Sequence, residues 1–117
     1  MVAIEARKVG PVVVLQVRGA LTIHERTPAL EHAIRAALDG GARVFVINLQ
    51  DVSAVDSSGV AQLATTHNAV FTHRGRLALC HLSPKLKEIF VITRLNTVFN
   101  TYETEAEALA AVTDRQP

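Results

Sequence analysis

The run Val44-Phe-Val-Ile-Asn-Leu49 is almost entirely apolar, and the segment Ala54-Val-Asp-Ser-Ser-Gly-Val-Ala61 follows it closely. A strand with this pattern is typical of a sheet that helices cover on both faces, so we expect it to be central. After Val60 the apolar residues recur at spacings of three and four, which predicts a helix from about Ser57 to His73. The polar segment therefore lies where a central strand passes into a helix.

The elements on either side continue an alternation of strands and helices. Two start signals support the later helices: Ser83-Pro84, and a capping box over Thr104-Glu-Ala-Glu107. The further predicted elements are strands at 2–6, 12–17 and 76–82, a brief strand at 98–99, and helices at about 25–38, 84–92 and 106–112.

This order predicts an α/β fold. A turn at Gly10-Pro11 makes the first two strands an antiparallel hairpin. Strands that alternate with helices become parallel neighbours through crossover connections. We therefore expect a mixed sheet of four to five strands packed with about four helices.

Composition limits the classes of function. At 117 residues and 49% hydrophobic, residues 1–117 have the size of a single domain, with 113–117 as a loose tail. The net charge is +1 and no basic cluster occurs, which argues against nucleic acid. No apolar run approaches the roughly 20 residues of a membrane-spanning helix, so direct membrane insertion is not expected. A lone Cys80 and an N-terminus without an apolar signal core favour the cytoplasm.

The segment before the second helix has a plain local interpretation. Asp56 is placed to cap the helix through its carboxylate. On an ideal helical wheel, residues 60, 63, 64, 67, 70 and 71 face the sheet, which leaves Ser58 facing solvent and Ser57 lateral. Gly59 costs about 0.5–1 kcal/mol relative to alanine. Our interpretation is that Gly59 leaves an open approach to the Ser58 hydroxyl for a kinase or a partner surface.

At this point the sequence resembles a known family. The run from Val44 to Val60, preceded by Val14-Leu-Gln-Val-Arg-Gly-Ala-Leu21 and followed by Arg74-Gly-Arg-Leu-Ala-Leu-Cys-His-Leu-Ser-Pro84, is similar to a STAS domain of the anti-sigma factor antagonist type. The likeness extends from about Val12 to Leu109. It implies a small α/β domain that binds an anti-sigma factor of the serine protein kinase type and thereby frees a sigma factor.

The resemblance also implies a switch. The phosphorylated residue of the family is the second serine of the Asp-Ser-Ser-Gly element, which is Ser58 here. A phosphate adds about −1.5 to −2 charges, and a helix N-terminus accommodates an anion, so we expect recognition to change while the fold does not. Thr22 and Asn48 stand where family members often carry acids, and we expect both positions to lie near the partner surface.

The predicted partner surface combines two connections. Parallel strands bring their following loops to one edge of the sheet, the usual binding edge of open α/β sheets. The residues that we assign to this surface are Thr22, Ile23, His24, Asp56, Ser57, Ser58 and Gly59.

Other interpretations of the sequence remain open. The serine element is compatible with a capped helix start and nothing more, or with a constitutive docking subunit of a stress-signalling complex or of an anion or lipid transport system. A serine hydrolase is disfavoured because the element lacks the Gly-x-Ser-x-Gly form. The five histidines have no metal-ligand spacing, so we expect no metal and no cofactor. The sequence predicts no oligomeric state.

Overall fold

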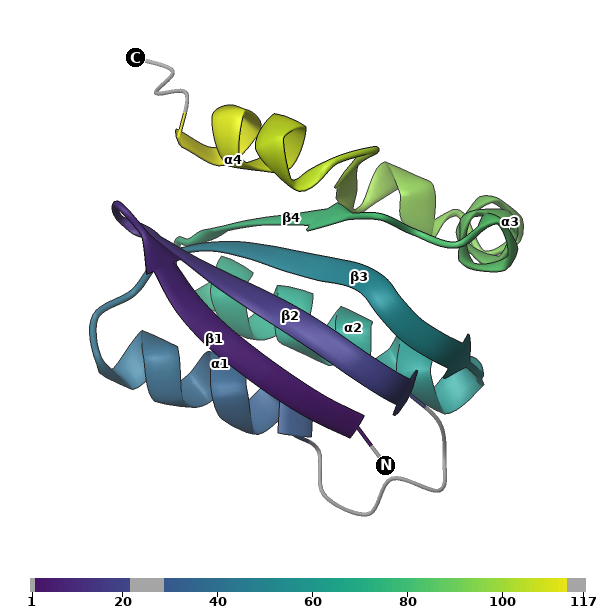
Figure 1. Ribbon diagram of the computed structural model, residues 1–117, viewed down its shortest axis with the longest axis horizontal. Coiled ribbons are helices and arrows are strands. Elements are labelled where there is room, and N and C mark those ends of the chain that lie inside the picture. The colour runs from purple at the N-terminus through teal and green to yellow at the C-terminus, as the bar shows by residue number, and fades with distance from the viewer. Residues whose placement is uncertain (1, 22–28, 114–117) are drawn as a thin grey trace.

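The computed structural model of the protein describes residues 2–21 and 29–113. Its strands form one mixed sheet in the order β1-β2-β3-β4-β5 (Figure 1). The first two strands are antiparallel, and each later strand is parallel to its neighbour, as predicted. The strands are β1 (Val2–Val9), β2 (Val12–Leu21), β3 (Val44–Val55), β4 (Arg76–Cys80) and β5 (Asn100–Tyr102).

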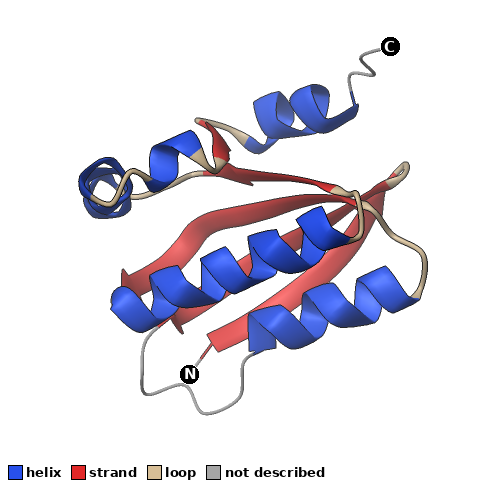
Figure 2. Ribbon diagram, turned by 180° about the vertical axis from the view of Figure 1, so that it is seen from behind, coloured by secondary structure: helices blue, strands red, loops and turns tan. Residues whose placement is uncertain are grey.

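Helices cover the two faces of the sheet unequally. Two of them, α1 and α2, lie side by side on one face, and α4 lies on the opposite face (Figure 2). Among the described elements, no helix covers most of this second face near β1 and β2 (Figure 1). The helices are α1 (Ala29–Asp39), α2 (Ser57–Thr72), α3 (Pro84–Ile92) and α4 (Glu105–Thr113), with a 3₁₀ turn, η1, at Leu95–Thr97.

The central position predicted for residues 44–49 is confirmed. β3 pairs with β2 on one side and with β4 on the other. Its Phe45 and Ile47 belong to the core under α1 and α2, whereas Val46 belongs to a smaller core under α4. Burial on both faces explains why apolar residues occupy successive positions of this strand.

Local signals place the turns and helix starts. The hairpin turns at Gly10, whose φ of 59° suits glycine. The Ser83 hydroxyl accepts a hydrogen bond from the Leu86 N–H at 3.1 Å, and the Thr104 hydroxyl accepts one from the Glu107 N–H at 3.1 Å. Both predicted helix-start signals are therefore confirmed.

Several strand boundaries differ from the prediction: β1 and β2 end later than expected, at Val9 and Leu21, and β4 ends earlier, at Cys80. β3 continues through the polar residues to Val55, because β2 extends alongside it as far as Leu21. The brief strand expected at residues 98–99 lies instead at Asn100–Tyr102. Phe99 is used for packing: its ring stacks on Phe90 with centroids 5.2 Å apart, inside the core. The predicted start of the first helix and most of the predicted tail lie outside the described residues.

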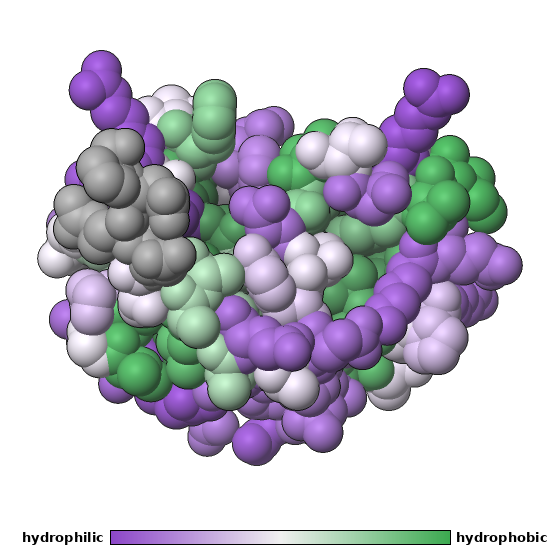
Figure 3. Space-filling model, turned by 90° about the horizontal axis from the view of Figure 1, so that it is seen from above, coloured by the Kyte–Doolittle hydropathy of each residue, from purple (hydrophilic) through white to green (hydrophobic). Residues whose placement is uncertain are grey.

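The molecular surface on the side of α3 and α4 carries both hydrophobic and hydrophilic residues (Figure 3). In Figure 3 hydrophobic residues on this face are divided by hydrophilic ones and do not form one continuous apolar area. Within the described part of the chain, no helix combines the length and apolar character needed to cross a membrane.

Candidate functional site

The candidate site lies at the edge of the sheet where β2 and β3 end and α2 begins (Figure 1). Leu21 pairs with Val55 at the last position of the ladder between these strands. The next residue, Asp56, donates its backbone N–H to the Leu21 carbonyl oxygen at 3.2 Å. The start of α2 is therefore held against the end of β2.

Asp56 caps α2 as predicted. Its backbone is extended, with φ −115° and ψ −171°, and its Oδ1 accepts the Gly59 N–H at 3.0 Å. Its carbonyl oxygen accepts the Val60 N–H, which begins the regular helical pattern. The carboxylate satisfies a free donor of the first turn and lies at the positive end of the helix dipole.

The structure assigns Gly59 a role that differs from our interpretation. Gly59 is buried, and a β carbon there would lie 2.9 Å from both the carbonyl carbon and the β carbon of Leu21. Real β carbons essentially never come that close to another heavy atom. Glycine is thus required by the close approach of α2 to β2, and the idea of an open approach to Ser58 at this position is wrong.

The exposures of the two serines are also the reverse of those predicted. Ser57 is exposed, whereas Ser58 is partly buried. The helical wheel placed the sheet-facing stripe through His67 and Phe71, but Phe71 is 72% exposed and the buried stripe contains Gly59 and Thr66 instead. The contact of Gly59 with β2 rotates the helix about its axis and turns Ser58 partly towards the protein.

A groove that the sequence did not predict adjoins this edge. It has a volume of about 200 Å³ and lies between the end of β3, at Ser53–Val55, and the start of α3, at Ser83–Leu86. Lys85 lines it and is exposed. The Ser83-Pro84 helix start was the available signal, because it indicated a second helix N-terminus at the same edge of the sheet.

Three of the predicted surface residues, Thr22, Ile23 and His24, lie outside the described residues, directly after Leu21 in the chain.

The described residues contain no candidate metal site. Among residues 2–21 and 29–113, no three His, Cys, Asp or Glu side chains are grouped so that they could hold a metal ion. Cys80 is buried, and burial raises the pKa of its thiol to about 12.

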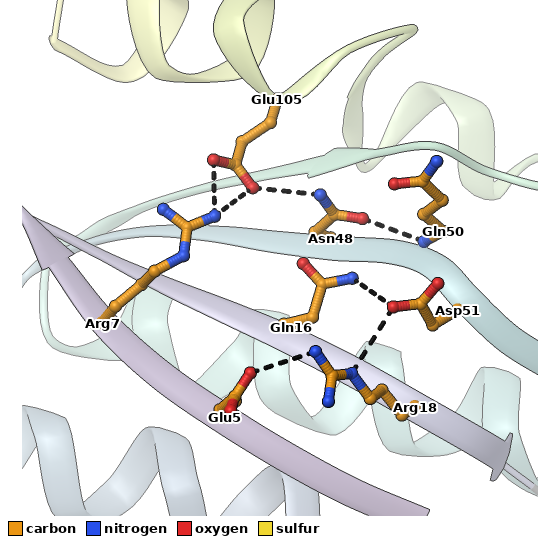
Figure 4. Close-up of polar contacts among 8 residues, drawn as sticks. All are labelled: Glu5, Arg7, Gln16, Arg18, Asn48, Gln50, Asp51 and Glu105. Carbon is orange, nitrogen blue, oxygen red and sulfur yellow. Dashed lines mark hydrogen bonds and ion pairs between the residues drawn. The ribbon is translucent and has the colours of Figure 1, made fainter.

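Asn48 does not lie at the candidate site. Figure 4 shows it on the α4 side of the sheet, in a polar cluster with Arg7 and Glu105. It is 4% exposed; its Nδ2 donates to Glu105 Oε1 at 3.0 Å, and its Oδ1 accepts the Gln50 N–H at 2.9 Å. The expectation that Asn48 lies near the predicted partner surface is therefore wrong.

Glu105 is the centre of this polar cluster. Arg7 Nη2 contacts both carboxylate oxygens at 2.6 Å. The hydrogen bond from Arg7, together with that from Asn48, lowers the pKa of Glu105 below its ordinary value although burial opposes the shift. An aspartate at position 48 would set a second carboxylate against Glu105, which explains why an amide suits this protein there.

Comparisons with known proteins agree with this fold. The family model of the STAS domain matches residues 3–108. The anti-sigma-B factor antagonist of Staphylococcus aureus is 29% identical over 94 residues, which are 80% of this chain and 86% of that protein. The structure of an anti-sigma factor antagonist from Mycobacterium paratuberculosis superposes with a TM-score of 0.85 at 28% identity, over 97% of this chain and 96% of that chain.

A further solved protein is similar in two states. The anti-sigma factor antagonist SpoIIAA in its unphosphorylated form has a TM-score of 0.74 at 25% identity, over 97% of this chain and all of that chain (100%). The phosphorylated form of SpoIIAA from Bacillus has a TM-score of 0.72 at 27% identity, over 94% of this chain and 99% of that chain. The present fold is thus similar to both forms of that protein.

Proposed function

Since this chain belongs to the STAS domain family, we propose that it acts as an anti-sigma factor antagonist. In this proposal it is a cytoplasmic regulator that binds an anti-sigma factor of the serine kinase type and has no catalytic activity of its own. The names of the similar proteins from Staphylococcus and Mycobacterium support it. The observation that carries the proposal is the position of Ser58 in the first turn of α2, two residues after its Asp56 cap.

The proposed contact surface is the start of α2 with its neighbours. Asp56, Ser57 and Ser58 form its centre, and the end of β3 beside Lys85 extends it. Gly59 supports this surface from beneath, because its contact with Leu21 fixes where α2 begins. We include Thr22, Ile23 and His24 because they follow Leu21, whose carbonyl oxygen is bonded to Asp56.

We propose that phosphorylation of Ser58 switches this surface off. A phosphate would add about −1.5 to −2 charges next to the Asp56 carboxylate. The positive end of α2 would accommodate that charge within the protein, whereas a docked partner would face both repulsion and added bulk. The similarity of this fold to unphosphorylated and phosphorylated SpoIIAA supports a switch that acts without refolding.

No feature of the serine element favours catalysis. The histidine on α2, His67, stacks on Phe71 with centroids 6.1 Å apart and contacts the edge of Phe99 at 5.1 Å. It therefore packs against rings more than two helical turns away from Ser58. A hydrolytic serine needs a base within hydrogen-bond reach.

The test compares matched serine variants. Tagged native protein and the variants Ser58→Ala, Ser58→Asp, Ser57→Ala and Ser57→Asp are incubated in native lysate depleted of ATP, and captured proteins are identified by mass spectrometry. Phosphosites are identified in a parallel incubation with ATP. We expect capture of an anti-sigma factor by native protein and Ser58→Ala, loss of capture with Ser58→Asp, and phosphate at Ser58 alone. Capture that Ser58→Asp leaves intact would contradict the switch. Phosphate confined to Ser57 would contradict the assigned residue.

A further inference from the structure

The outer edge of β1 is long, and none of the described strands lies beside it. β1 lies at the end of the sheet, and all of its residues, Val2 to Val9, pair with β2 on the inner side. Within the described residues, no other strand pairs with the outer side. In such an edge strand every second residue directs its backbone N–H and C=O groups away from the sheet, and this row of groups is a template for pairing with another strand.

The hairpin determines which residues face outward. Val9 and Val12 close the two-residue turn at Gly10-Pro11, and such a closing pair exchanges backbone hydrogen bonds. In an antiparallel ladder, hydrogen-bonded pairs alternate with pairs that are not bonded to each other. Glu5 and Arg7 therefore direct their N–H and C=O groups at β2, and the intervening residues Ile4, Ala6 and Lys8 direct theirs outward.

Charge selects one register for an antiparallel second copy. For two β1 strands to form hydrogen bonds along their outer sides, residues whose backbone groups point outward must lie opposite one another. The register between the two strands can therefore change only in steps of two residues. With Ala6 opposite the partner's Ala6, Glu5 lies opposite the partner's Arg7, and symmetry repeats this pair. A shift of two residues in one direction sets Glu5 against the partner's Glu5, and in the other direction Arg7 against the partner's Arg7. Like charges directly opposite are destabilising.

The side chains of β1 that face α1 also favour a second copy of this chain as the binding partner. A groove of about 770 Å³ runs between β1 and α1, and its walls include Ala6, Lys8, Ala33, Ala36 and Ala37. Ile4 belongs to this face, because it packs on the core under α1. In the selected register the partner's Ile4 lies opposite Lys8 and thus brings an apolar side chain next to this alanine-rich groove.

We propose that the outer edge of β1 binds a second copy of this chain, antiparallel and centred on Ala6, so that the two sheets become continuous. The backbone groups supply the pairing, and the charge pairs between Glu5 and Arg7 set the register. Both side chains lie at the surface, since Glu5 is 70% and Arg7 51% exposed. Each already has a partner within its own chain, Arg18 for Glu5 at 3.2 Å and Glu105 for Arg7 at 2.6 Å, so the contacts across the two copies would join these pairs into one network of alternating charge. The proposal is independent of the proposed function, because it uses no residue of the contact surface at the start of α2.

Disulfide trapping tests the register. In the selected register the two Ala6 Cα atoms lie about 5.5 Å apart, within the range of a disulfide. The two Ala3 Cα atoms lie about 20 Å apart along the strands. We expect Ala6→Cys to form a covalent dimer under mild oxidation and Ala3→Cys, also exposed on β1, to remain monomeric; the native Cys80 is buried. Equal cross-linking of both variants, or none in either, overturns the proposal.

Sedimentation equilibrium of the full chain over a concentration series measures the dimer dissociation constant and so tests whether the outer edge of β1 binds a second copy. We expect Glu5→Lys to raise the dimer dissociation constant about tenfold, because two attractive pairs become repulsive. Glu88→Lys, an equal charge change on exposed α3, leaves it unchanged. Ala6→Pro removes an outward N–H, which an edge strand tolerates, so it abolishes the dimer while circular dichroism shows a native fold. A native chain that is monomeric at its highest soluble concentration, or a dimer unaffected by Glu5→Lys, overturns the proposal.

Discussion

The carbonyl group of Leu21, the last residue of β2, lies so close to Gly59 in the first turn of α2 that no side chain fits between them. The same carbonyl oxygen accepts the backbone N–H of Asp56 at 3.2 Å. One peptide group thus determines where α2 begins and how the helix is rotated about its axis. The exposures of Ser57 and Ser58 follow from this contact.

Replacement of Gly59 tests the contact. We expect Gly59→Ala to lower the free energy of unfolding by about 2 kcal/mol or more, because the added β carbon must displace the backbone of β2 or α2. The control is Gly40→Ala, where a β carbon would meet its nearest atoms at an ordinary 3.5 Å. Denaturant unfolding followed by circular dichroism measures both. A Gly59→Ala protein as stable as Gly40→Ala would contradict the packing described.

The amide of Asn48 is expected to be required beside Glu105. Asn48→Asp sets two carboxylates against each other in a nearly buried position, so the free energy of unfolding at pH 7 falls by about 1–3 kcal/mol. Adding Glu105→Gln restores one neutral partner, and we expect the double variant to recover most of the loss. Asn96→Asp, at an exposed position, is the matched control. Chemical denaturation measures the free energy of unfolding of the native protein, Asn48→Asp, the double variant and Asn96→Asp. A double variant no more stable than Asn48→Asp would refute the contact between residues 48 and 105.

Glu105 also predicts a dependence of stability on pH. Its pKa is lowered in the folded protein, chiefly by the hydrogen bond from Arg7. A lowered pKa contributes stability above the unfolded-state value of about 4.3, and this contribution is lost as the pH falls through the folded-state value. We expect Glu105→Gln to be less stable than the native protein at pH 7 and the difference to shrink below about pH 4. Thermal unfolding from pH 7 to pH 3 measures it, with Glu88→Gln as control; a difference independent of pH would argue against this role.

The thiol of Cys80 is expected to be inert while the protein is folded. Burial within β4 raises its pKa to about 12, so almost no thiolate is present at pH 8. Ellman's reagent should therefore leave the native protein unmodified and react with one thiol in denaturant. Ser57→Cys provides an exposed thiol for comparison and is expected to react at once. Rapid labelling of Cys80 in the native state would show that β4 opens readily.

Local patterns in the sequence were sufficient for the elements and their order. Alternating strands and helices, the turn at Gly10-Pro11 and the caps at Asp56, Ser83 and Thr104 depend on neighbours within a few residues. The mixed sheet follows from them, because a hairpin makes antiparallel neighbours and crossover helices make parallel ones. The family, too, was evident from the residues between Val44 and Val60.

Contacts between residues distant in sequence decided the rest. The rotation of α2 depends on Gly59 meeting Leu21, 38 positions earlier, and the environment of Asn48 depends on Arg7 and Glu105. An ideal helical wheel contains no information about which neighbour a helix touches, and a strand pattern does not show which face a single distant helix will cover. The sequence by itself therefore determined the fold and the family, whereas packing in three dimensions determined which side chains at the start of α2 reach the surface.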